Sequence, residues 1–105
     1  MTSKDDIISR IKYSVHATDP EAKIILFGSF ARGDHRKDSD MDIIILLEKD
    51  RVSREDEKRI KYPLYEIEFE SGQVISPLVL SKSDWETRHK VTPLYQNVHS
   101  EGIEL

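Results

Sequence analysis

The chain has 105 residues, of which 37% are hydrophobic and 34% are charged, and this size and balance predict one globular domain spanning residues 1–105. The formal net charge is −4, which argues against general nucleic-acid binding, and the absence of cysteine excludes disulfides and thiolate metal sites. No apolar run approaches the roughly 18 residues of a membrane span, and the N-terminal residues lack the apolar stretch of a secretory signal, so we expect a cytoplasmic protein without a membrane partner.

The first predicted element is a helix at residues 4–17. Ser3 and Asp6 form a capping-box pattern, in which each residue can accept a hydrogen bond from the other's backbone N–H. The isoleucines and valine that follow recur at helical spacing, so one face of this helix is apolar. Pro20 closes the region, because proline does not continue a helix.

Two apolar runs in the first half of the chain predict strands. Residues 23–27 (KIILF) end at Gly28 and suit a buried strand. Residues 29–39 carry turn-prone and basic side chains, which predict a single helical turn followed by an ordered loop. Residues 41–47 (MDIIILL) are β-branched and continuously apolar after Asp42, as expected for a strand that is covered on both faces.

Two interpretations are open for the segment after Ser53. A second capping-box pattern at Ser53 and Asp56 and apolar residues at helical spacing predict a helix that ends at Gly72. Pro63 falls inside that helix, and residues 64–80 also show the alternation of a β-hairpin. The helix is favoured, because the element order then becomes helix, strand, strand, helix, strand.

The last third of the chain predicts one strand and two short helices. The strand covers residues 74–80, and Pro77 within it favours a position at the sheet edge, because proline cannot donate a ladder hydrogen bond. A short helix begins at Ser83, and a last helix begins at the Thr-Pro pair of residues 92–93 and ends at Gly102. Together the elements predict an α+β fold, with a mixed sheet flanked by helices.

The candidate metal ligands are Asp40 and Asp42, at the start of the second strand. Alternate side chains of a strand share a face, so both carboxylates point the same way. Two adjacent carboxylates repel each other and attract a hard divalent cation, and Mg²⁺ is held by one or two carboxylates together with substrate phosphates. The pair therefore predicts a Mg²⁺ site in which Asp40 and Asp42 are both metal ligands and catalytic residues.

The candidate nucleotide-binding residues precede this pair. Gly28 permits close approach of the backbone, and Ser29 offers a hydroxyl and an N–H group to phosphate oxygens. Arg32 adds positive charge that favours a triphosphate, and Ser39 completes the predicted set. The other basic side chains between the strands are assigned to the surface.

The Gly28-Ser29 pair, a spacer of ten residues, and an Asp-x-Asp pair leading into an apolar strand resemble the DNA-polymerase-β-type nucleotidyltransferase superfamily. Within it, the chain is most similar to minimal stand-alone proteins of prokaryotes, which often pair with a helical HEPN-type protein. The specific motif covers residues 27–43. The resemblance implies transfer of a nucleoside monophosphate from a nucleoside triphosphate (NTP) to a hydroxyl with two Mg²⁺ ions, Gly28 and Ser29 contacting phosphate, and Asp40 and Asp42 binding metal.

One position departs from the pattern that the resemblance implies. The family carries a third carboxylate on the next core strand, where it binds metal and helps to deprotonate the acceptor hydroxyl; the apolar pattern places Ser76 there. A positioned general base contributes typically ~10²–10⁴ in rate. The side chains left open as substitutes are Glu66, Glu68, Glu70 and Asp84.

Two functions therefore remain open. The first is a Mg²⁺-dependent nucleotidyltransferase that modifies a hydroxyl of a protein or a small molecule, as the antitoxin-like member of a pair with a HEPN-type partner. The second is a catalytically weak or inactive module for nucleotide binding or protein interaction, which the serine at position 76 favours. The sequence leaves the acceptor, the preferred base and the formation of a homo-oligomer open.

Overall fold

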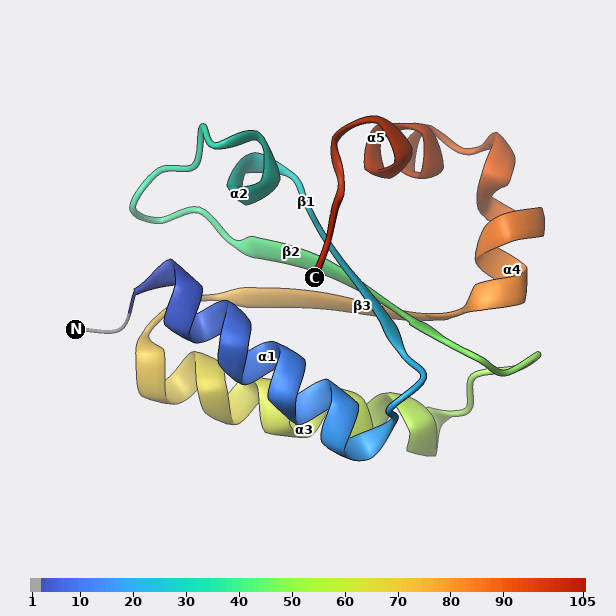
Figure 1. The fold of residues 1–105 in the computed structure, drawn as a ribbon, viewed down its shortest axis with the longest axis horizontal. Helices are drawn as coiled ribbons and strands as arrows, with labels where there is room; N and C mark the ends of the chain where they lie inside the picture. Colours follow the sequence, from blue (N-terminus) through green and yellow to red (C-terminus); the bar gives the residue numbers. More distant parts are fainter. Residues whose placement is uncertain (1–2) are drawn as a thin grey trace.

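A computed structural model describes residues 3–105 and confirms the expected α+β fold (Figure 1). Across these residues, no helix combines the length and apolar character needed to cross a membrane. In chain order the elements are α1 (Lys4–Thr18), β1 (Lys23–Phe27), α2 (Ser29–Arg32), β2 (Met41–Leu47), α3 (Arg54–Ser71), β3 (Ile75–Ser81), α4 (Lys82–Thr87), the 3₁₀ turn η1 (His89–Val91), α5 (Pro93–Glu101) and β4 (Ile103–Glu104).

The four strands form one mixed sheet in the order β3-β2-β1-β4. β1 is antiparallel to both of its neighbours, β2 and β4, whereas β2 and β3 are parallel. Parallel neighbours need a crossover connection, and α3 supplies it. β3 lies at the edge of the sheet, as Pro77 predicts.

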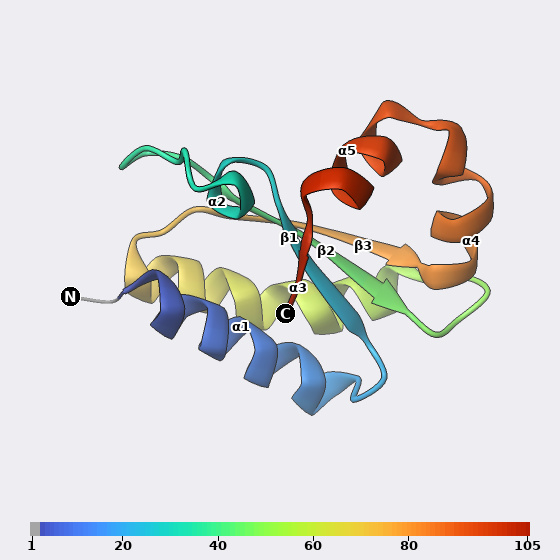
Figure 2. The same ribbon diagram turned by 45° about the horizontal axis from the view of Figure 1, so that its top comes forward.

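Helices cover both faces of the sheet (Figures 1 and 2). α1 and α3 pack on one face, where Ile11 and Leu64 are buried against Ile43 and Ile45 of β2. α4 and α5 cover the other face around a smaller cluster that contains Trp85 and Val98. β2 is therefore buried on both sides, which explains its continuous apolar sequence.

The segment after Ser53 is the continuous 18-residue helix α3, so the hairpin alternative is wrong. Both hydrogen bonds of the capping box between Ser53 and Asp56 are present, and Gly72 ends the helix in the left-handed conformation at φ 75°. Pro63 is accommodated inside the helix although it removes one backbone hydrogen bond. The buried apolar face of α3, centred on Leu64, outweighs that loss.

Three details near the C-terminus differ from the predictions. The third strand begins and ends one residue later than expected, and α4 begins at Lys82 with Ser81 as its N-cap rather than at Ser83. After α5, the chain adds the short strand β4 to the free edge of β1, which the sequence pattern does not reveal. Two residues are too few to show an alternation of apolar and polar side chains.

Candidate functional site

The turn between β1 and α2 lies directly beside Asp42. Gly28 caps α2 with a φ of +74°, a conformation that favours glycine. A Cβ atom added to Gly28 would lie only 2.6 Å from Oδ2 of Asp42, so the absent side chain leaves room for that carboxylate. The expected proximity of the Gly28-Ser29 turn to Asp42 is therefore present in the structure.

Asp42 is the second residue of β2, and Asp40 is the residue directly before this strand. In the sheet, Asp42 lies between Phe27 of β1 and Ser76 of β3. Because side chains alternate along a strand, Asp42 shares its face with Ile44, on the side of the sheet that α4 and α5 cover. The hydroxyl of Ser76 lies 3.5 Å from Oδ2 of Asp40, so Ser76 adjoins both aspartates.

The electrostatics of this pair favour a bound cation. Burial and the neighbouring charge of Asp40 raise the pKa of Asp42, whereas the positive charge of Arg32 opposes that rise. A divalent cation would relieve the repulsion, and hard carboxylate oxygens suit Mg²⁺. Within residues 3–105, no group of three or more histidine and carboxylate side chains is placed to hold a metal. Two carboxylates plus phosphate oxygens and water are therefore the donor set that fits.

The remaining predicted nucleotide-binding residues take different positions. Ser29 is the first residue of α2, next to the Gly28 turn. The guanidinium of Arg32 donates to Asp34 at 3.2 Å and to Glu101 at 3.0 Å, which joins α2 to α5. The hydroxyl of Ser39 accepts the backbone N–H of Arg36 at 2.7 Å, so this side chain closes a turn of the loop.

Gln73 is a positioning residue that sequence reasoning missed. Its Nε2 donates to the carbonyl oxygen of Ser39 at 2.8 Å and to that of Val74 at 2.9 Å. The N–H of Met41 donates to the same Val74 carbonyl at 2.9 Å. These bonds fix the backbone on both sides of Asp40, and no sequence signal marks an amide side chain in a connection for this role.

We predict that Gln73→Ala lowers transfer activity by ~10–100-fold, the usual cost of removing an outer partner of a metal ligand. The loss should include a weaker apparent affinity for Mg²⁺, because the backbone that carries Asp40 is no longer held. Titration of the initial rate with Mg²⁺ measures both effects. Gln96→Ala is the matched control, since Gln96 also donates to a backbone carbonyl, that of Lys90, but in α5. Equal rates for the two variants would contradict the role of Gln73.

None of the side chains considered as substitutes for the third carboxylate reaches the aspartate pair. Glu68 accepts a hydrogen bond from the N–H of Ile75 at 2.8 Å. Asp84 lies in α4, which follows the C-terminal end of β3, whereas Ser76 lies near the N-terminal end of that strand. Glu70 pairs with Arg10 of α1, and Glu66 lines the groove between α1 and α3. The position beside Asp42 in β3 is therefore held by a serine hydroxyl.

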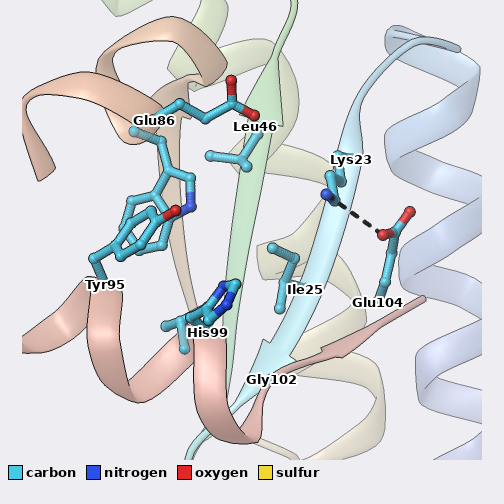
Figure 3. Close-up of a pocket in the computed structure, with 10 residues that line it drawn as sticks. Lys23, Ile25, Leu46, Glu86, Tyr95, His99, Gly102 and Glu104 are labelled. Carbon is cyan, nitrogen blue, oxygen red and sulfur yellow. Dashed lines mark ion pairs between the residues drawn. The ribbon is translucent and has the colours of Figure 1, made fainter. Parts of the chain in front are cut away.

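A hollow lies between the sheet and helices α4 and α5, on the sheet face that also carries Asp42 (Figure 3). It has a volume of about 340 Å³, and an ion pair between Lys23 and Glu104 lies at its edge. Trp85 is buried against Tyr95, with 5.0 Å between the ring centroids, so the two rings pack together. None of the candidate nucleotide-binding or metal-binding residues lines this hollow.

Gly28→Ala should lower transfer activity by more than ~10-fold because the new methyl group displaces Asp42, and the strained φ should cost of order 1–3 kcal/mol of stability. Gly33→Ala is a matched control: Gly33 has φ +84°, but a Cβ there would meet no atom within 4 Å. Both variants should therefore lose stability in thermal unfolding, Gly28→Ala at least as much as Gly33→Ala, and only Gly28→Ala should lose activity. A similar loss of activity in both would assign the effect to backbone strain.

Comparisons with known proteins identify the family of this chain. Residues 8–90 match the family model of the nucleotidyltransferase domain. A protein of Methanocaldococcus jannaschii, named "Putative protein adenylyltransferase", is 33% identical over 103 residues, which cover 95% of this chain and 96% of that protein.

Two solved structures illustrate the shared fold. One, described as a toxin-antitoxin with AMP-PNP, is 18% identical, has a TM-score of 0.64, and is matched over 97% of this chain and 72% of its own. Another, described as a "putative minimal nucleotidyltransferase", is 25% identical, has a TM-score of 0.61, and is matched over 96% of this chain and 94% of its own. With a family match over most of its length and a relative of matching extent, this chain belongs to the nucleotidyltransferase domain family.

Proposed function

We propose that this protein is a Mg²⁺-dependent nucleotidyltransferase that transfers AMP from ATP to a hydroxyl of a protein. The observation that carries the proposal is the contact of the Gly28 turn with the carboxylate of Asp42, with Asp40 next to it. The family supports nucleotidyl transfer, and the name of the M. jannaschii relative supports both the adenylyl group and a protein acceptor.

In this proposal the residues of the site have different tasks. Gly28 and Ser29 accommodate the phosphates at the start of α2, while Asp40 and Asp42 hold Mg²⁺. Bound Mg²⁺ would supply electrostatic stabilisation for the charge that develops on the transferred phosphoryl group and the departing pyrophosphate. Arg32 adds positive charge near Asp42 and keeps α2 joined to α5.

Transfer also needs a base that takes the proton of the attacking acceptor hydroxyl. A serine hydroxyl is no general base at neutral pH, so Ser76 cannot take the proton of the attacking hydroxyl. A partner chain would supply the acceptor and its base together. A structural neighbour is described as a toxin-antitoxin pair, which supports a partner chain here. The helical, HEPN-type partner is the one that the sequence resemblance implies.

Incubation with Mg²⁺ and each of the four α-labelled NTPs tests the proposal, with the protein alone and together with the product of the neighbouring reading frame. We expect a protein acceptor to become labelled, and to be labelled faster from ATP than from the other three NTPs. Chelation of Mg²⁺ should abolish the labelling. The absence of transfer under all these conditions, in the presence of a folded protein, would refute the enzyme.

Ser76 favours a second candidate function, a nucleotide-binding module without transfer. Asp40 and Asp42 would then bind Mg²⁺·ATP, and the bound nucleotide would control association with the partner. Calorimetry separates the two functions: binding of ATP that requires Mg²⁺ and is not followed by labelling supports the module.

A further inference from the structure

Three aromatic side chains form an exposed stripe along the outer side of α3. Tyr62, Tyr65 and Phe69 follow each other at helical spacing, and they are 58%, 43% and 90% exposed. On the neighbouring helix α1, Tyr13 is 81% exposed. The buried side of α3, formed by Ile60, Leu64 and Ile67, faces the sheet, so the aromatic stripe points directly away from the core.

Charge is divided along α3 on either side of this stripe. Residues 58–61 carry three positive charges and no negative one, whereas residues 66–70 carry three negative charges and no positive one. The acidic residues of the first turn pair with the basic ones: Glu55 with Lys58, Asp56 with Arg59, and Glu57 with Lys61. Residues 54–61 together therefore carry four positive and three negative charges. The net charge of α3 is therefore weakly positive before its aromatic centre and negative after it.

We propose that α3 docks onto α3 of a second copy of this chain in an antiparallel arrangement. A two-fold axis near Tyr65 would place the basic segment of each helix against the acidic segment of the other, with the tyrosines meeting at the centre. Such a contact is isologous, because the same surface is used by both copies. Parallel pairing would instead oppose like charges along the whole helix.

The exposed area of the stripe suits a weak, reversible dimer. At their observed exposures the three rings offer about 400 Å² per copy, or about 800 Å² for two copies. The flanking charged side chains raise this toward the roughly 1,200 Å² of the smallest specific interfaces. We therefore expect a dimer that forms at micromolar concentrations and dissociates on dilution or at high salt.

α3 lies on the opposite side of the sheet from α4 and α5 (Figure 2). Asp42 shares its face with Ile44, on the side that α4 and α5 cover. Dimerisation through α3 would thus leave both copies of the candidate site open. The inference is independent of the proposed function, because association can be measured without nucleotide, metal or acceptor.

Charge reversal followed by mixing tests the arrangement. Lys58→Glu/Lys61→Glu makes both segments of α3 acidic, and Glu66→Lys/Glu70→Lys makes both basic, so each variant alone should be monomeric. Because Glu70 also pairs with Arg10 of α1, both variants must keep the circular dichroism spectrum of the unaltered chain. In an equimolar mixture, the acidic helix faces the basic helix along its whole length, and dimers should return. Sedimentation equilibrium of the full chain, compared at low and high salt, measures the change from the mass of one chain to the mass of two.

Two further variants guard against loss of folding. Arg88→Glu/Lys90→Glu reverses the same amount of charge at two exposed positions, the C-cap of α4 and η1, and it should dimerise as the unaltered chain does. Phe69→Ser removes the most exposed ring of the stripe and should raise the dissociation constant at least tenfold with an unchanged circular dichroism spectrum. An unaltered chain that stays monomeric at millimolar concentration, or a mixture that fails to restore dimers, would overturn the proposal.

Discussion

Asp42→Asn should lower nucleotidyl transfer by about 10³-fold, because a metal ion supplies several kcal/mol of charge stabilisation and each 1.36 kcal/mol is tenfold in rate. Asn keeps the size of the side chain beside Gly28 but replaces one carboxylate oxygen with an uncharged NH₂ group, which cannot bind a cation. Asp40→Asn should have a comparable effect, since the two carboxylates act on one cation. Initial rates of label transfer from α-labelled ATP over a range of Mg²⁺ concentrations measure the loss.

The same substitution should leave the fold intact and raise its stability. The raised pKa of Asp42 means that the folded state binds the proton more tightly than the unfolded chain does. The ionised carboxylate therefore costs folding free energy above that pKa, and the cost disappears as the pH falls through it. Removing the charge should increase the melting temperature of the metal-free protein at neutral pH.

Asp38→Asn is the matched control, because it makes the same chemical change on an exposed loop side chain two residues before Asp40. It should retain full activity and the original melting temperature. Residual transfer in Asp42→Asn near the unaltered rate would mean that the carboxylate pair does not bind the catalytic metal. A lower melting temperature would mean that Asp42 stabilises the free protein, contrary to the shift of its pKa.

The elements that local sequence determines are the ones that sequence analysis predicts well. Both capping boxes, at Ser3 and at Ser53, form as their spacing indicates, and each begins a long helix. α3 shows how a local conflict is resolved: Pro63 opposes a helix, yet burial of the apolar face around Leu64 prevails. Burial depends on the neighbouring sheet, so the alternation that suggests a hairpin could not be dismissed from the sequence alone.

The candidate site also has features that local sequence predicts and contacts that it does not. The closeness of Asp40 to Asp42 agrees with the period of a strand, and the need for glycine at position 28 follows from the adjacent carboxylate. The bond from Gln73 to the Ser39 carbonyl and the bridge from Arg32 to Glu101 join residues far apart in the sequence. Such contacts arise only when the sheet and α5 are in place, and no pattern along the chain announces them.

Ser76→Asp should raise the rate of transfer by ~10²-fold or more, since a positioned general base contributes ~10²–10⁴. The register of the sheet places residue 76 beside Asp42, and the Ser76 hydroxyl already lies 3.5 Å from Asp40. A carboxylate introduced there can take the acceptor proton and share in binding the cation. Single-turnover labelling of the acceptor, at saturating ATP and Mg²⁺, measures this step separately from product release.

Stability provides a second measurement of the same variant. Three carboxylates in one place repel each other, so Ser76→Asp should melt at a lower temperature than the unaltered chain without metal. Because Mg²⁺ binds only the folded state, it should restore that loss in proportion to its concentration. Ser76→Asn, which has nearly the size of Asp but no charge, should show neither the faster transfer nor the dependence on metal. A slower Ser76→Asp enzyme whose melting temperature does respond to Mg²⁺ would show that the cation binds there but that the proton leaves by another route, through a base on the acceptor itself.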